Sequence, residues 1–191
     1  MNSQKIKIRI GVLTAFILLA AFSRIIPHIP NFSPLGAMAL FGAAHFTKKW
    51  QAFLIPIAAT WVSDLFINNM IYAEYYPNFT WFYQGFYWQY ASYLAIVLSA
   101  IFILKKINPA RVLVGAFSST AIFFLLSNFG CWIGSTFYPQ NFGGLITCYA
   151  AGIPFLKGTM LGDVFYSTAL FGSYSLVQNS FPVLRLPKVK P

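Results

Sequence analysis

Four polar side chains set inside long apolar runs carry most of the chemistry that this sequence could do. Arg24, Asp64, Asn128 and Asp163 each interrupt a stretch dominated by aliphatic and aromatic residues. An ionisable group at membrane depth is costly, so it usually faces a partner, a cavity or a transport pathway. We therefore expect these groups to mark a functional site.

These groups all lie toward the outer ends of their apolar runs, together with neighbouring polar and aromatic residues. Asn128 and Trp132 are four residues apart and share one helix face. A proton or ion path needs polar groups through the full depth of the membrane, and the inner parts of the runs are almost purely apolar. The asymmetry predicts a pocket that opens outward and ends near the midplane. Its expected substrate-binding residues are Arg24, His28, Asp64, Asn128, Trp132, Tyr149 and Asp163.

A purely structural role for the same residues is the alternative. Arg24 with Asp64, or Lys157 with Asp163, could form internal ion pairs that fix helix packing. His28 could instead cap the proline-rich turn that follows the first apolar run.

The composition decides the class of protein. Of 191 residues, 58% are hydrophobic and only 8% are charged. Soluble domains carry about 25% charged residues, and disordered chains have low hydrophobicity. A soluble enzyme and a disordered chain are both excluded, and residues 1–191 are expected to form a single transmembrane domain.

The apolar runs predict an all-α integral membrane bundle of six transmembrane helices. The second helix is short, and residues 143–152 could form a half-helix at the interface before the sixth. The predicted spans are about 8–26, 34–46, 51–72, 87–104, 112–133 and 154–177.

The basic residues set the predicted orientation. Eleven of the thirteen Lys and Arg residues fall on one side of this six-span topology, and the loops at 73–86 and 135–152 contain none. Cytoplasmic loops carry an excess of Lys and Arg, so both termini are expected in the cytoplasm of a multi-pass inner-membrane (cytoplasmic-membrane) protein. The net charge of +10 then needs no nucleic-acid partner. Alternatively, the first apolar run is a cleaved signal peptide, which would leave five spans in the same orientation.

Two other patterns suggest contact surfaces. Residues 71–90 hold eleven aromatic side chains, which could form an interfacial belt or a lid over a ligand, with Trp81, Tyr83 and Trp88 as the ligand-facing candidates. Gly11 and Ala15 have the small-xxx-small spacing that lets membrane helices pack tightly, either within the protein or against a partner helix.

The sequence contains no motif typical of catalysis or metal binding. There is no phosphate-binding Walker loop, no HExxH motif and no cluster of Cys and His. Cys131 and Cys148 allow at most one disulfide. We expect neither enzymatic activity nor a cofactor or bound metal.

Five segments resemble an uncharacterised family of small bacterial membrane proteins. They are "RIIPHIPNFSPLGAMALFGAA" (24–44), "SDLF" (63–66), "SNFGCWIGSTFYP" (127–139), "GLITCYAAGIPF" (144–155) and "GDVFY" (162–166). That family in turn resembles the substrate-binding S components of energy-coupling-factor transporters in size, number of spans and orientation. The resemblance covers about residues 24–172.

The resemblance implies a protein that binds a vitamin or metal-related micronutrient at the outer face for uptake. A coupling membrane subunit with two ATPases would supply the energy and would dock on Gly11 and Ala15. Solitary cobalamin-binding relatives use a cysteine in the third span as the cobalt ligand. This chain has Asp64 there instead, which argues against cobalamin.

Two other functions remain as alternatives. The chain could be a non-transport accessory or structural subunit of a larger membrane complex, with a pocket packed shut by side chains. It could also be a membrane enzyme acting on a lipid or quinone, with Asp64, Asp163 and His28 as acid–base groups.

Overall fold

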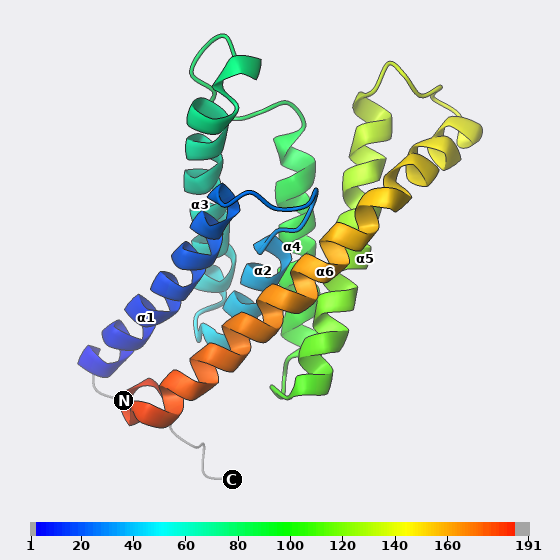
Figure 1. Cartoon of the computed structure of the whole chain (residues 1–191). Helices are drawn as coiled ribbons and strands as arrows, with labels where there is room; N and C mark the ends of the chain where they lie inside the picture. The colour runs from blue at the N-terminus through cyan, green and yellow to red at the C-terminus, as the bar shows by residue number, and fades with distance from the viewer. Residues whose placement is uncertain (1–2, 186–191) are drawn as a thin grey trace.

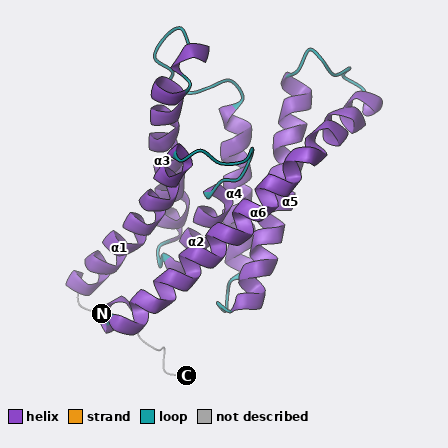
Figure 2. Ribbon diagram, in the orientation of Figure 1, coloured by secondary structure: helices purple, strands orange, loops and turns teal. Residues whose placement is uncertain are grey.

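The computed structural model describes residues 3–185, and the described chain is helical throughout, with no strand (Figures 1 and 2). The predicted all-α class is confirmed. The helices are α1 (Ser3–Phe22), α2 (Leu35–His45), α3 (Lys49–Phe66), α4 (Phe86–Ile103), α5 (Pro109–Gly134) and α6 (Phe142–Ser180). A π-helical turn (Ile67–Ile71) extends α3, and short 3-10 turns occupy Ser23–Ile25, Ala73–Tyr75 and Pro182–Leu184.

Five of the described helices are long and apolar enough to cross a membrane, which identifies a multi-pass membrane protein. The sixth, α2, is as short as predicted. Its 11 residues span about 16 Å, against about 30 Å of bilayer hydrocarbon. It lies in the centre of the bundle, where it packs against all five long helices (Figure 1). Most of its side chains are buried, so α2 is the core around which the long helices pack.

The expected half-helix before the last span is wrong, because α6 runs without interruption from Phe142 to Ser180. Its start is fixed by Asn141, whose side chain accepts a hydrogen bond from the backbone N–H of Gly144 at 2.9 Å. Pro154 removes only one backbone hydrogen bond and does not end the helix. The 39 residues span about 58 Å, so α6 exceeds the bilayer thickness and crosses the bundle obliquely (Figure 1).

The two ends of the bundle differ in composition. We call one the basic end, where α1 begins, α6 ends and the α4–α5 connection lies (Figure 1). It holds Lys5, Lys7, Lys48, Lys49, Lys105, Lys106, Arg111 and Arg185. The opposite, aromatic end consists of the loops at 72–85 and 135–141. Lys188 and Lys190 lie outside the described residues. That the basic end is cytoplasmic stays a prediction.

A buried arginine closes the basic end. Arg9 donates from Nε to the carbonyl of Leu184 at 3.1 Å and from Nη2 to the carbonyl of His45 at 2.5 Å. These carbonyls lie where α2 ends and in the turn after α6, so one side chain ties three segments together. The apolar side chains of Leu13, Phe41 and Phe171 belong to the buried core of the bundle.

The segment 26–34 turns the chain back into the bundle between α1 and α2. Its prolines cannot continue a helix, and Asn31 adopts a left-handed backbone with φ of 61°. This loop lies against α6 because Gly158 and Gly162 have no side chains. A Cβ at either position would collide with the backbone of Pro30 or Ser33. We call residues 26–34 the proline loop.

Candidate functional site

A cavity of about 460 Å³ lies between the proline loop, the start of α2 and helices α3 to α6. Its volume falls within the range of small-molecule sites, about 300 to 1,000 Å³. Its lining includes the exposed residues His28 and Tyr72 and the buried residues Ser119 and Asp163. The cavity therefore extends from the surface into the interior of the bundle. We call it the main cavity.

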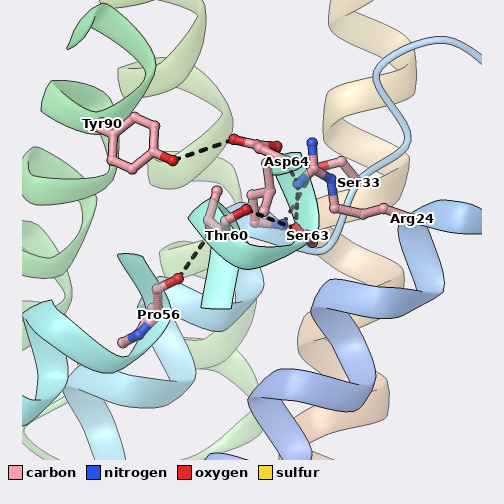
Figure 3. A network of polar contacts seen from close by, with 8 residues as sticks. Arg24, Ser33, Pro56, Thr60, Ser63, Asp64 and Tyr90 are labelled. Atoms are coloured by element: carbon pink, nitrogen blue, oxygen red, sulfur yellow. Dashed lines mark hydrogen bonds and ion pairs between the residues drawn. The ribbon is translucent and has the colours of Figure 1, made fainter. Parts of the chain in front are cut away.

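Arg24, which lines the main cavity, forms an ion pair with Asp64 (Figure 3). Arg24 donates from Nη1 to Asp64 Oδ1 and to Ser63 Oγ, both at 2.7 Å, and Tyr90 donates its hydroxyl to Asp64 Oδ2 at 3.3 Å. Arg24 lines the cavity, whereas Asp64 stands behind it. The predicted Arg24–Asp64 pair is confirmed.

The second buried carboxylate is held in a different way. Asp163 is 3% exposed, and its Oδ2 accepts a hydrogen bond from Thr120 Oγ1 at 2.8 Å. Its Oδ1 lies beside the Cα of Gly36 and near Ser119, so that a Cβ at Gly36 would collide with both side chains. The predicted pair with Lys157 does not form. Lys157 is exposed, and the only ion pair within residues 3–185 is Arg24–Asp64.

Helix α4 supplies further polar groups to the cavity, Gln89 and Tyr93. Tyr93 is 3% exposed, stacks on the ring of Phe123, and its hydroxyl has no hydrogen-bond partner in the structure. A buried hydroxyl without a partner costs free energy, which a bound solute could recover. Apolar Ile96 and Phe123 complete this wall.

A smaller cavity of about 250 Å³ adjoins the first, between α5 and α6. Asn31, Phe123 and Thr159 line both, so the two spaces are neighbours. The smaller cavity also contains Asn128 and Cys131, and its remaining lining is largely aromatic and aliphatic.

The structure brings together only some of the predicted binding residues. Arg24, His28 and Asp163 line the main cavity, and Asn128 lines the smaller one. Trp132 and Tyr149 line neither. The indole N–H of Trp132 donates to the carbonyl of Pro139 at 2.9 Å, and the hydroxyl of Tyr149 donates to the carbonyl of Leu125 at 2.6 Å. Both contacts connect α5 to its neighbours.

The sequence reasoning missed Gln89, Tyr93, Ser119 and Thr159. A signal existed for Ser119, because Ser118, Ser119 and Thr120 form a polar run in the middle of an apolar helix. Hydroxyl groups in membrane helices commonly bond their own backbone, as Thr120 does with Ala116, so such a run does not by itself indicate a binding site.

The three residues of the aromatic segment that were predicted to face a ligand do not do so. Trp81, Tyr83 and Trp88 line neither cavity. Trp81 is exposed and stacks on Trp61. The hydroxyl of Tyr83 is buried without a partner, and burial raises the pKa of this phenol well above its usual value. Tyr72, from the same segment, does line the main cavity.

The remaining predicted features lie on the outside of the bundle or are structural. Gly11 and Ala15 are exposed on α1, so docking of a partner there stays a prediction. Cys131 is exposed and Cys148 is buried, and both are free thiols. Residues 3–185 contain no group of three or more His, Cys, Asp or Glu side chains placed to hold a metal ion.

Comparisons with known proteins identify a family but no function. No curated protein and no solved structure matches the chain. A family model matches residues 4–184, nearly the whole chain. The chain therefore belongs to a family of unknown function, DUF6580.

Proposed function

We propose that this protein binds a small polar solute in the main cavity, entering from the aromatic end, as the first step of micronutrient uptake. The observation that carries the proposal is the cavity itself. It has the volume of a small-molecule site and a partly buried lining that combines the arginine of an ion pair, a separate carboxylate and a hydroxyl without a partner.

The inner part of the bundle supports binding rather than conduction. Below the main cavity, α2 is packed on all sides, with Leu40 and Phe41 fully buried. Arg9 and the carbonyls that it contacts close the basic end. A solute in the cavity therefore meets a packed apolar core and cannot pass without a rearrangement of the helices.

That rearrangement needs energy, and the sequence contains no phosphate-binding loop of its own. We propose that other subunits supply it, in the manner of an S component, with the exposed small residues Gly11 and Ala15 as a docking face. An accessory subunit with a pocket packed shut is less well supported, because the cavity is open and polar.

A pair of matched variants on α6 tests solute binding. Thr159 lines both cavities, whereas Thr168 is exposed and lines neither, and each hydroxyl donates to the carbonyl four residues earlier. We expect wild type and Thr168→Trp, purified in mild detergent, to carry the same small molecule, detectable by mass spectrometry. Thr159→Trp should lose it, because the indole fills the site.

Equal amounts in all three proteins would place the solute outside these cavities. A wild-type protein that carries nothing through purification, and whose thermal midpoint no solute raises, would contradict the proposal.

A further inference from the structure

We infer that the solute carries a positively charged nitrogen, such as a protonated amine, and that this nitrogen pairs with Asp163 at the floor of the main cavity. The inference rests on the proposed function and adds the chemical class of the ligand to it.

No basic side chain in residues 3–185 balances the charge of Asp163. Its described neighbours are the hydroxyls of Thr120 and Ser119 and the Cα of Gly36. Hydroxyl donors stabilise a carboxylate but leave its charge in place. A buried carboxylate without a counter-ion is costly, so it either takes up a proton or pairs with a cation, and a cation brought by a ligand removes that cost.

The other charged groups at the main cavity balance one another. Arg24 and Asp64 neutralise each other across a 2.7 Å contact. His28 is exposed near the opening, and its Nδ1 lies 3.0 Å from the carbonyl of Ile29. Asp163 is therefore the one unbalanced formal charge among the described residues that line the main cavity or pair with its lining. An anionic solute would bring a second negative charge beside it, whereas a cationic one would make the site neutral.

A solute in the main cavity can reach the carboxylate of Asp163. Asp163 lines the main cavity, and Gly36 next to it presents no side chain that could cover Oδ1. Across the cavity, the hydroxyl of Tyr93 is buried without a partner and can bond a polar group on the solute. Ile96 offers an apolar surface for its carbon skeleton.

A simple organic cation tests this ligand class without knowledge of the natural solute. We would measure thermal unfolding of the full chain in mild detergent in propylammonium chloride and, at equal ionic strength, in sodium chloride. Wild type should gain several degrees in propylammonium. Asp163→Asn should gain nothing, and Glu74→Gln, which removes an exposed acid outside the cavity, should behave like wild type.

An internal cation provides a second test. Thr159 lies one helical turn before Asp163, so Thr159→Lys places an ammonium group within reach of the carboxylate. We expect this variant to unfold at a higher temperature than wild type in sodium chloride and to gain nothing from propylammonium. A midpoint below that of wild type with an undiminished response to propylammonium would contradict the pairing.

The outcomes separate the ligand class from the proposed function. Equal propylammonium shifts in wild type and Asp163→Asn would overturn the inference alone. The inference alone would also be overturned if the wild-type protein carries a solute that has no basic nitrogen and Thr159→Trp loses this solute. If neither propylammonium nor any co-purified solute stabilises the wild-type protein, the inference and the proposed function both fail.

Discussion

Asp64 and Asp163 are the two carboxylates inside the bundle, and their surroundings differ in one respect that matters for function. Asp64 is bonded to Arg24 and to Tyr90, so its charge is balanced within the protein. Asp163 is bonded to Thr120 and has no basic partner among the described residues. A paired charge inside a membrane protein is explained by packing, whereas an unpaired one beside a cavity is a candidate for pairing with a ligand.

The largest expected effect is the loss of stability in Asp64→Asn. The substitution leaves the partly buried Arg24 without its counter-ion. Removal of one partner of a fully buried pair costs about 3 to 5 kcal/mol, and we expect about 2 to 3 kcal/mol here because Arg24 is partly exposed. Denaturant unfolding in detergent measures the change. Arg24→Gln combined with Asp64→Asn should recover part of the loss, and a double variant less stable than either single variant would contradict the pairing.

Next in size is Gly36→Ala. The added methyl group would collide with Ser119 and Asp163, so the start of α2 must shift. Overpacking of this kind costs about 1 to 3 kcal/mol, and we also expect loss of solute binding. Gly172→Ala is the control, because nothing lies within 4 Å of a Cβ there. If both variants unfold at the same temperature as wild type, the floor of the cavity is looser than the structure shows.

A smaller effect on stability is expected for Asp163→Asn. The amide is the same size and removes an unbalanced charge, so the free energy of unfolding of the empty protein should change by about 1 kcal/mol or less. Solute binding should nevertheless fall at least tenfold, as measured by titration of the co-purified compound. A loss of stability as large as that of Asp64→Asn would indicate that Asp163 is structural.

The smallest effect is expected for Asn128→Ala. Asn128 lines the smaller cavity, and its amide donates to the carbonyl of Phe124 within its own helix at 2.8 Å. Binding should weaken only a few-fold, if the solute reaches past Thr159 into that space. A loss as large as that of Asp163→Asn would move the centre of the site toward α5 and α6.

Much of the fold could be predicted from the sequence, because a helix that spans a membrane needs an apolar run of a set length. Apolar runs of the required length and the distribution of Lys and Arg predicted six helices, the short second one among them. The uninterrupted course of α6 was missed, because Pro154 and the glycines around it indicated a break. A single proline costs a membrane helix only part of its hydrogen bonding, and neighbouring segments can compensate.

The site was predicted less well than the fold, for a physical reason. Charged residues are rare inside apolar runs, so Arg24, Asp64 and Asp163 could be predicted to mark the site. Which of them pair depends on where α1 ends and how the proline loop returns, and hydropathy carries no information on either. Trp132 was predicted to line the pocket because it shares a helix face with Asn128, and Tyr149 was predicted to line it as well, whereas the structure shows their polar atoms bonded to backbone carbonyls.

The most direct test of the difference between the two carboxylates is the identity of the small molecule carried by the purified protein. We would compare wild type, Asp163→Asn and Glu74→Gln by mass spectrometry after purification in mild detergent. We predict a compound with a protonatable nitrogen in wild type and in Glu74→Gln, and its absence from Asp163→Asn. A compound retained equally by all three proteins, or one without a basic nitrogen, would contradict the assignment of Asp163 as the counter-ion of the solute.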